Sequence, residues 1–316
     1  MTTTLDEARA ATATVGDRVR RTELVPAPAL SRRLGVDIRL KRELDQPTGS
    51  FKVRGVFHAM LTRTPRELAR GVLAFSAGNH AAAVAYAAGT LGVPATVCMP
   101  GHAVARKVEA TRALGAEVVL VERDLVGTAM RIADERGLTL IHPFDDPAIV
   151  AGHAGVGLEI ASDAPDTDLV VVPVGGGGLI SGVAAGLAAA PPGVRIVGVE
   201  PEGADVVSRS LAAGAPQVQP GPTSVADGLT APITGAVPFA HIVSLVDRVV
   251  RVSDDDILTA LGVLISEEGV IAEPAAAAGL AALLTGVVPV APGRRVVLVV
   301  SGGNVNPALV ARYAAR

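Results

Sequence analysis

Lys52 is the residue whose type and setting most favour covalent chemistry. The chain has three lysines, and Lys52 lies between Phe51 and Val53 rather than on a charged face. Arginine occupies most other basic positions. A guanidinium cannot replace an amine that must form an imine, because only the amine can lose a proton and attack a carbonyl. The alternative is an ordinary surface lysine on a helix.

A second candidate segment is a run of four glycines, made up of Gly175, Gly176, Gly177 and Gly178. The run follows the apolar segment 169–174 and precedes a helical stretch that starts near Leu179. Glycine N–H groups at a helix N-terminus can approach an anion without interference from Cβ, so we expect a phosphate there. The run lacks the spacing of a dinucleotide fingerprint and the lysine of a P-loop. A flexible turn is the alternative.

Two more turns carry small or polar residues where a strand is expected to end. The first, which suits a carboxylate through its hydroxyl and free N–H groups, consists of Ser76, Ala77, Gly78, Asn79 and His80. The second begins at Ser301 and ends at Asn304. Each alone is also typical of a plain strand-to-helix turn. Ligands bind at the carboxyl ends of strands in open α/β sheets, so we expect these loops to converge with the segment 46–55 on one ligand.

The elements that must position these loops follow a strand and helix alternation. We expect strands at 72–75, 95–99 and 117–121, with helices at 79–89 and 103–114. A second series is expected later, with strands at 169–174, 195–199 and 295–300 and helices at 179–190 and 254–268. Strands that are separated by helices of this length pair in parallel. The pattern therefore predicts an α/β fold.

Length and composition limit the possible classes of protein. At 316 residues, the chain favours two domains, or one large α/β domain with a substantial lobe. Hydrophobic residues make up 49% but aromatic residues only 2%, so aliphatic side chains must fill the core. The net charge of −3 and the lack of a basic run give no reason to expect nucleic acid as a partner. The single cysteine, Cys98, excludes an intrachain disulfide and fits a reducing compartment.

We expect no membrane partner and a cytoplasmic location. The N-terminal segment has acidic residues and no apolar stretch typical of a secretory signal. Two long uncharged stretches, 169–194 and 274–293, are interrupted by glycine and proline. Buried strands and helices explain them better than membrane spans do. The expected partner is a small molecule.

Seven segments, taken together and in order, resemble the threonine/serine dehydratase and serine racemase group of fold-type-II pyridoxal-phosphate (PLP) enzymes. They are KRELDQPTGSFKVRG, FSAGNH, VVPVGGGGLISG, EPEGAD, VADGL, EPAAAAGLAAL and VVSGGN, and they span roughly residues 20 to 306. The resemblance implies a two-domain fold like that of the tryptophan synthase β chain, with parallel sheets flanked by helices. It places a small domain at 48–141 and a large PLP-binding domain at 1–47 and 142–316, with a homodimer.

The resemblance also implies roles for individual residues. Lys52 matches the lysine that carries PLP as a Schiff base, and Phe51 matches the residue whose ring packs on the cofactor. Asn79 matches the contact to the phenolic oxygen, and Ser301 the hydroxyl beside the pyridine nitrogen. Gly228 matches the residue over the other side of the ring. The implied phosphate cradle consists of Gly175, Gly176, Gly177, Gly178 and Leu179. The implied substrate carboxylate loop consists of Ser76, Ala77, Gly78, Asn79 and His80.

The implied activity is the β-elimination of a β-hydroxy amino acid of the threonine or serine type, giving a 2-oxo acid and ammonia. The freed Lys52 removes the Cα proton and the β-hydroxyl leaves. Alternatives within the class are dehydratases for 3-hydroxyaspartate or an aryl-serine. Outside it, the alternatives are a serine racemase-like activity, a β-replacement synthase and a PLP-binding protein without turnover.

Several positions depart from the family pattern and narrow these alternatives. Ala77 replaces the second serine of serine racemases, so a proton donor on the far face is lacking and elimination is favoured. The four glycines and His80 argue against a β-replacement synthase. Phe144 and Ala231 replace polar residues of serine-handling relatives, which indicates a more apolar pocket. Arg131 could meet a second carboxylate, although a helix-surface arginine is the simpler interpretation.

Two further departures concern metal binding and a histidine. Metal-using relatives carry an acidic cluster that corresponds to Glu200, the Ala204 carbonyl and position 206. Position 206 is Val206 here and the adjacent Asp205 points elsewhere, so we expect no metal site. His153 replaces the usual glutamine, and we expect it to be a packed or capping histidine.

Overall fold

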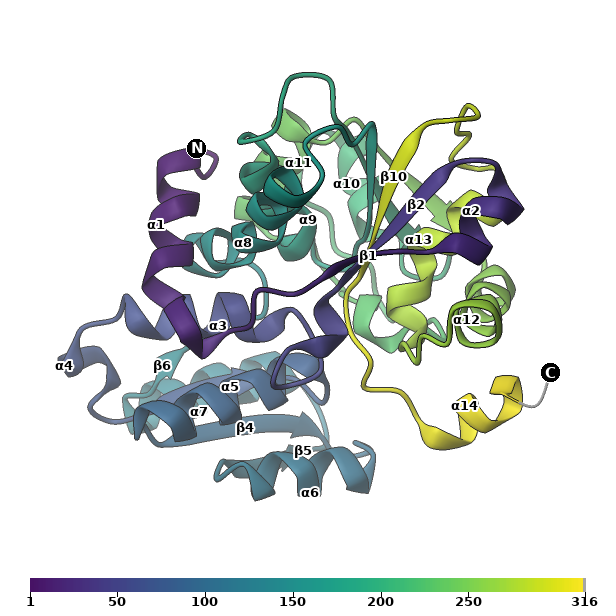
Figure 1. Ribbon diagram of the computed structural model, residues 1–316. Coiled ribbons are helices and arrows are strands. Elements are labelled where there is room, and N and C mark those ends of the chain that lie inside the picture. Colours follow the sequence, from purple (N-terminus) through teal and green to yellow (C-terminus); the bar gives the residue numbers. More distant parts are fainter. Residues whose placement is uncertain (315–316) are drawn as a thin grey trace.

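A computed structural model describes residues 1–314, which form two β-sheets flanked by helices (Figure 1). The larger sheet has six strands in the order β1-β2-β10-β7-β8-β9. Its strands are β1 (Leu24–Pro26), β2 (Asp37–Arg42), β7 (Leu169–Pro173), β8 (Arg195–Pro201), β9 (Arg248–Val252) and β10 (Arg295–Val300). All neighbouring strands are parallel except the pair β1 and β2. The carboxyl ends of β2, β10 and β7 therefore meet at one edge.

The smaller sheet has four parallel strands in the order β5-β4-β3-β6. They are β3 (Val72–Phe75), β4 (Ala95–Pro100), β5 (Glu117–Val121) and β6 (Thr139–Leu140). The connecting helices are α5 (Asn79–Leu91), α6 (Ala105–Ala113) and α7 (Leu125–Arg136). In Figure 1 this sheet and its helices lie below the larger sheet. The smaller sheet lies within residues 48–141, and the larger sheet lies outside that range.

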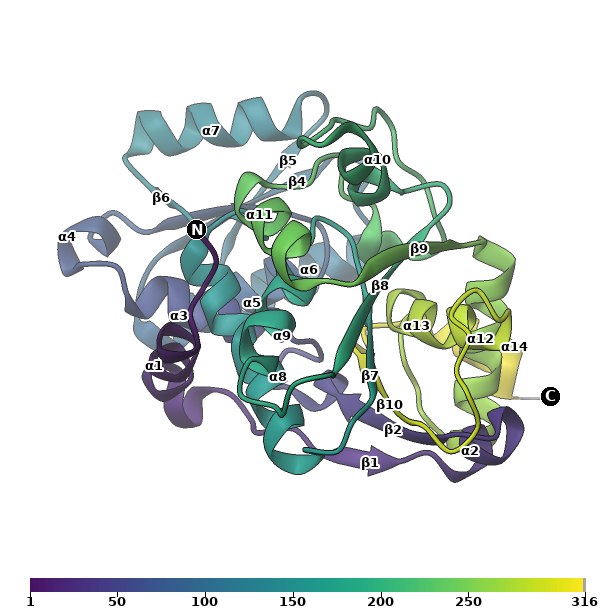
Figure 2. The same ribbon diagram turned by 90° about the horizontal axis from the view of Figure 1, so that it is seen from above.

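The remaining helices cover the larger sheet and join the two parts. They are α1 (Leu5–Val15), α2 (Pro28–Leu34), α3 (Lys52–Leu61), α4 (Pro65–Leu68), α8 (Pro147–Asp163), α9 (Gly178–Leu187), α10 (Val206–Ala213), α11 (Ala236–Leu245), α12 (Asp254–Glu268), α13 (Pro274–Leu284) and α14 (Pro307–Ala314), with 3₁₀ turns η1 (Gly16–Arg18), η2 (Glu43–Asp45) and η3 (Asp227–Leu229). Figure 2 shows α8, α9 and α11 on one side of β7 and β10, and α12 and α13 on the other. The predicted α/β arrangement is confirmed.

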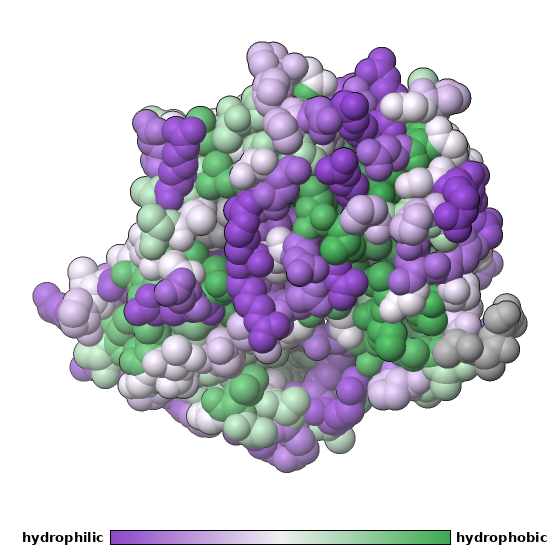
Figure 3. Space-filling model, in the orientation of Figure 1, coloured by the Kyte–Doolittle hydropathy of each residue, from purple (hydrophilic) through white to green (hydrophobic). Residues whose placement is uncertain are grey.

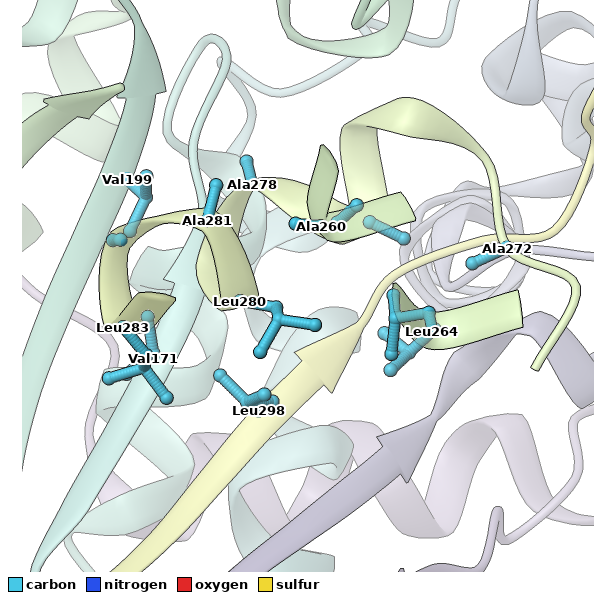
Figure 4. Packing of buried hydrophobic residues seen from close by; sticks show 14 of the residues in the cluster. Val171, Val199, Ala260, Leu264, Ala272, Ala278, Leu280, Ala281, Leu283 and Leu298 are labelled. Carbon is cyan, nitrogen blue, oxygen red and sulfur yellow. The ribbon is translucent and has the colours of Figure 1, made fainter. Parts of the chain in front are cut away.

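Both faces of the larger sheet are buried, which explains the uninterrupted apolar runs in its central strands. Along β7, Val171 packs toward α13, and the neighbouring Val170 and Val172 belong to the cluster on the opposite face. Figure 4 shows Val171 and Leu298 beside Leu280 and Leu283 of α13. Small and aliphatic side chains fill this interface, as the low aromatic content predicted.

Two glycines allow α8 and α9 to pack closely. A Cβ atom on Gly157 would lie 2.2 Å from the Val183 carbonyl oxygen, and one on Gly186 would lie 2.2 Å from the Ala154 carbonyl oxygen. Real Cβ atoms cannot approach backbone that closely, so both positions require glycine. This contact fixes α9, whose first residues belong to the glycine run, against α8.

Within the described part of the chain, no helix combines the length and the apolar character needed to cross a bilayer. On the face shown in Figure 3, hydrophilic residues cover much of the surface and hydrophobic residues lie in separate patches among them.

Candidate active site

A cavity of about 830 Å³ lies where the segments that follow β2, β3, β7 and β10 meet. Every predicted site residue lines it: Phe51, Lys52, Ser76, Ala77, Gly78, Asn79, His80, Gly175, Gly176, Gly177, Gly178, Leu179, Gly228 and Ser301. The structure therefore brings together loops that are separated by up to about 250 residues in the sequence.

Lys52 is the first residue of α3, and its amine faces the cavity. The Phe51 N–H donates to the Ser301 carbonyl oxygen at 3.1 Å, which ties this turn to the end of β10. Lys52 Nζ donates to the Pro143 carbonyl oxygen at 2.6 Å. Burial lowers the pKa of the Lys52 ammonium to about 8. A neutral amine is thus accessible near physiological pH, as imine formation requires.

The other two lysines are engaged in ion pairs. Lys41 Nζ lies 2.5 Å from a Glu159 carboxylate oxygen in the protein interior, and Lys107 Nζ lies 2.6 Å from Asp227 Oδ2. Within residues 1–314, Lys52 forms no salt bridge. Lys41 is fully buried outside the cavity and the amine of Lys107 is held by a carboxylate, so Lys52 is the lysine best suited to act as a nucleophile in the cavity.

A buried charge cluster holds α3 in place. Arg54 Nε donates to Glu43 at 2.8 Å, and Arg54 Nη1 donates to Glu159 at 2.7 Å. Lys41 also contacts Glu159, so two cations face two carboxylates. These side chains are almost fully buried and come from β2, η2, α3 and α8. The cluster therefore positions the helix that begins at Lys52.

Phe51 rests against His153 of α8. The two ring centroids are 4.8 Å apart with an interplanar angle of 66°. His153 is completely buried, and neither ring nitrogen has a hydrogen-bond partner in the described part of the chain. Burial keeps the pKa of His153 well below its usual range, so the ring is neutral. His153 is a packed histidine behind the cavity wall, in line with the packing alternative predicted for it.

The glycine run forms the N-terminal turn of α9. Gly177 is the N-cap with φ of +94°, a conformation that side chains rarely adopt. A Cβ on Gly176 would lie 2.5 Å from the Phe144 ring, and a Cβ on Gly178 would lie 2.9 Å from the Phe144 side chain. No side chain caps α9, so the N–H groups of its first turn stay free for an anion.

The loop that follows β3 forms a second helix N-terminus in the same cavity. The Ser76 hydroxyl accepts a hydrogen bond from the Gly78 N–H at 3.1 Å, and the Ser76 N–H donates to the Cys98 carbonyl oxygen at 3.0 Å. No side chain caps α5, which begins at Asn79. Its free N–H groups suit a carboxylate. Burial lowers the pKa of His80 to about 3, so this ring stays neutral beside the loop.

Glu273 is a site residue that was quoted within a sequence motif but not predicted individually. Its Oε1 accepts a hydrogen bond from Asn79 Nδ2 at 2.7 Å, and Asn304 Nδ2 donates to Asn79 Oδ1 at 2.8 Å. Burial raises the pKa of the Glu273 carboxyl to about 7. The available sequence signal was an acidic residue directly before Pro274 and an alanine-rich helix, which predicts an N-cap and no partner.

Gly228 and Ser301 lie on further walls of the cavity. A Cβ on Gly228 of η3 would lie 3.2 Å from the Ala275 side chain. Ser301 is buried at the end of β10. Asp227, which precedes Gly228 in η3, pairs with Lys107 of α6. This ion pair joins η3 to a helix of the smaller sheet at the cavity.

The structure also locates the residues whose departures from the family pattern were noted. Phe144 and Ala231 line the cavity, so both contribute apolar side chains to its wall. Arg131 lies on α7, pairs with Glu135 at 2.9 Å and stays largely exposed outside the cavity.

The position that corresponds to the acidic cluster of metal-using relatives is built around a helix cap. Glu200 accepts hydrogen bonds from the N–H groups of Val207 and Ser208, each at 2.8 Å. Asp205 pairs with Arg209 and Arg251. Over residues 1–314, no group of three or more histidine, cysteine or acidic side chains is arranged to hold a metal ion.

A comparison with family models matches residues 15–302 to the family described as pyridoxal-phosphate dependent enzyme. The chain belongs to this family. Among similar proteins, the L-threonine ammonia-lyase of Thermotoga maritima is 39% identical over 98% of this chain and 77% of that protein. The phenylserine dehydratase of Ralstonia pickettii is 39% identical over 92% of this chain and 89% of that protein. Maize serine racemase superposes with a TM-score of 0.93 at 33% identity, covering 99% and 97% of the two chains.

The cavity of this pyridoxal-phosphate dependent enzyme fits its cofactor on geometric grounds. The side chain of Lys52 offers an amine without a carboxylate partner, and the free N–H groups of α9 form a cradle that a Cβ on Gly176 or Gly178 would disturb. The amine and the anion cradle match the aldehyde and the phosphate of PLP.

Proposed function

We propose that this PLP enzyme eliminates water from a β-hydroxy amino acid of the threonine or serine type and releases a 2-oxo acid and ammonia. The observation that carries this proposal is the position of Lys52, whose amine has no carboxylate partner and shares one cavity with the uncapped N-termini of α5 and α9. The similar proteins named L-threonine ammonia-lyase and phenylserine dehydratase support the same reaction class.

Within this proposal, the residues of the chain divide the work. The N–H groups of α5 and the Ser76 hydroxyl hold the substrate carboxylate, which fixes Cα near Lys52. The neutral amine of Lys52 accepts the Cα proton. When bound, PLP supplies an aldehyde for the amines and a conjugated ring that takes up the electron pair left at Cα. The N–H groups of α9 would hold its phosphate.

The wall around the cofactor site tunes the outcome. Ser301, a neutral hydroxyl rather than a carboxylate, would face the pyridine nitrogen and would not hold it protonated. Phe51 and Gly228 would flank the ring, and Asn79 would contact its phenolic oxygen. Because the electron pair is then less delocalised, loss of the β-hydroxyl is favoured over return of a proton.

Racemisation is the second candidate function, because maize serine racemase is a structural neighbour. Ala77 argues against it. The loop offers the Ser76 hydroxyl, which in this proposal holds the substrate carboxylate, and no hydroxyl at position 77. A β-replacement synthase and a PLP-binding protein without turnover are the remaining alternatives.

We also propose a homodimer in the cytoplasm, with residues 48–141 as a small domain that moves against the rest of the chain. The two separate sheets and the position of the cavity at their junction support the domain division. Closure of the small domain over the substrate carboxylate would exclude water from the reacting carbon.

A panel of amino acids tests the proposal. Purified enzyme is incubated with L-threonine, L-serine, phenylserine and 3-hydroxyaspartate, and ammonia, 2-oxo acid and D-amino acid are measured. We expect equal amounts of ammonia and 2-oxo acid from at least one substrate, without accumulation of the D-amino acid. Rapid formation of D-serine would favour the racemase, and a yellow protein that releases no ammonia would indicate a binding protein.

A further inference from the structure

We propose that the cavity contains an aromatic subsite that accepts an aryl group on the substrate β-carbon, so that the preferred substrates are aryl-bearing β-hydroxy amino acids. This inference rests on the proposed β-elimination. The first observation is where the aromatic residues lie. The sequence contains five phenylalanines, two tyrosines and no tryptophan. Four of these seven residues line the cavity: Phe51, Phe75, Tyr86 and Phe144.

Two of the four rings belong to an aromatic row. His142 lies between Phe75 and Phe144, with ring centroids 5.5 Å from Phe75 and 4.9 Å from Phe144 and interplanar angles of 81° and 86°. His142 Nδ1 accepts the Asp145 N–H at 2.8 Å, which holds the turn that carries Phe144. The absence of side chains on the glycine run leaves room for the Phe144 ring. The row therefore lines the cavity with aromatic rings from both sides of the proposed domain junction, Phe75 from the small domain and Phe144 from the rest of the chain.

One face of α5 extends the cavity away from the carboxylate loop. Asn79, Ala82 and Tyr86 line the cavity and lie three and four residues apart, which places them on the same side of the helix. The small side chain of Ala82 leaves space between the other two. Tyr86 is held edge to face by Phe57 at 6.0 Å, and Leu114 lines the same cavity. Next to the carboxylate loop there is thus room bounded by apolar and aromatic groups.

The aromatic row carries no cation for a second substrate carboxylate. Arg131 lies outside the cavity and pairs with Glu135. Of the cations that line the cavity, Lys107 pairs with Asp227, and Arg106 makes a hydrogen bond of 3.4 Å to the Val305 carbonyl oxygen. Both belong to α6 and not to the row, so a carboxylate placed against Phe75 and Phe144 would meet aromatic rings, which is costly. An aryl ring gains edge-to-face and stacking contacts there.

The reaction balances for such a substrate without a further reagent. The Cα proton and the β-hydroxyl leave as water, and the enamine takes up a proton at Cβ to give an imine. Water then hydrolyses the imine, so phenylserine gives phenylpyruvate and ammonia. The same steps convert threonine to 2-oxobutanoate and ammonia.

The first test compares kcat/KM for phenylserine and threonine in the holoenzyme. We expect phenylserine to be preferred by about tenfold or more, the size of effect that a fitted apolar pocket supplies. A tenfold preference for threonine would overturn the inference while leaving the proposed β-elimination intact. If neither substrate yields ammonia, the proposed function fails, and the subsite is decided by the binding experiment below.

The binding experiment uses the two analogues that lack the β-hydroxyl, L-phenylalanine and L-2-aminobutyrate. Their Kd values are measured from changes in the visible absorbance of the holoenzyme. We expect L-phenylalanine to bind about tenfold or more tightly than L-2-aminobutyrate, by the same contacts. Equal Kd values, or tighter binding of L-2-aminobutyrate, would overturn the subsite.

Variants separate the subsite from a general structural role. Phe75→Ala and Ala82→Leu should each lower kcat/KM for phenylserine about fivefold or more and change that for threonine less than about twofold, because they remove a wall or fill the space of the ring. Phe239→Leu, on α11 outside this cavity, is the matched control and should change neither. Equal losses for both substrates in Phe75→Ala and in Ala82→Leu would contradict the subsite.

Discussion

Asn79 Nδ2 donates a hydrogen bond of 2.7 Å to Glu273 Oε1, although the two residues are 194 positions apart. Asn304 donates to the opposite end of the same amide, so the amide cannot flip without losing both bonds. Nδ2 has a second hydrogen, and Asn79 lines the cavity. Glu273 is therefore a positioning residue that keeps an N–H donor of Asn79 available to the site.

Glu273→Ala should weaken PLP binding by about tenfold, because the orienting hydrogen bond of Asn79 is lost. Glu273→Gln retains a carbonyl acceptor and should lose less affinity. Equilibrium dialysis of PLP, together with the visible spectrum of the bound cofactor, checks this order. Unchanged affinity and spectrum in Glu273→Ala would show that the amide is positioned by other groups.

The depressed pKa of Lys52 predicts how apoenzyme takes up PLP as pH changes. Burial lowers this pKa to about 8, and only the neutral amine forms an imine. The rate of colour development should therefore rise with pH, with a midpoint near 8, and level off at higher pH. Stopped-flow absorbance at saturating PLP gives this pH profile. The same measurement on a small free amine corrects for the pH dependence of PLP itself. A midpoint near the ordinary lysine value of 10.5 would mean that the amine is not shielded.

The buried charge cluster predicts a large loss of stability in Arg54→Ala. This change leaves Glu43 and Glu159 in the interior with Lys41 as the remaining cation. The free energy of unfolding should fall by about 3–5 kcal/mol, which is typical when one partner of a buried ion pair is removed. Urea unfolding of the apoenzyme measures it.

Arg131→Ala is the matched control for Arg54→Ala, because Arg131 is also a helical arginine paired with a glutamate. Its pair is exposed, with 61% and 58% of the two side chains accessible, so the change should stay within about 0.5 kcal/mol. Similar losses in the two variants would mean that the cluster is not a special anchor of α3.

Ala77→Ser tests the explanation for one-way elimination. A hydroxyl at this position would offer a proton on the face opposite Lys52, so D-amino acid should form alongside the 2-oxo acid. Chiral chromatography of residual serine gives the ratio of the two reactions. If the variant forms no D-serine and the unmodified enzyme does, the assignment of position 77 is incorrect.

The sequence predicted elements well where local signals agreed. Helix α12 was predicted residue for residue, because Ser253 forms a capping box with Asp256 and Gly269 ends the helix in the left-handed region. The predicted helix 179–190 ends instead at Leu187, since 188–190 form turns without a capping signal. The strands β1, β2, β6 and β9 were not predicted. β2 carries alternating charged residues, and one of them, Lys41, is buried in an ion pair that no local pattern reveals.

The candidate site shows the same division. Loops after parallel strands could be expected to converge, and they all line one cavity. The contacts of Glu273 with Asn79 and of Lys107 with Asp227 depend on how distant segments pack, so sequence spacing could not indicate them. In the sequence, only the adjacent residues distinguish Lys52 from Lys41 and Lys107. In the structure, Lys41 and Lys107 form ion pairs with carboxylates, whereas Lys52 donates to a backbone carbonyl.

Peptide mass spectrometry after borohydride reduction of the holoenzyme tests directly whether Lys52 carries the cofactor. Reduction fixes an imine as a stable secondary amine on the lysine that formed it. We expect a pyridoxyl-phosphate adduct on the peptide that contains Lys52, and none on those that contain Lys41 or Lys107. We also expect a colourless Lys52→Ala protein. An adduct on Lys41 or Lys107, or a yellow Lys52→Ala protein, would contradict this role of Lys52.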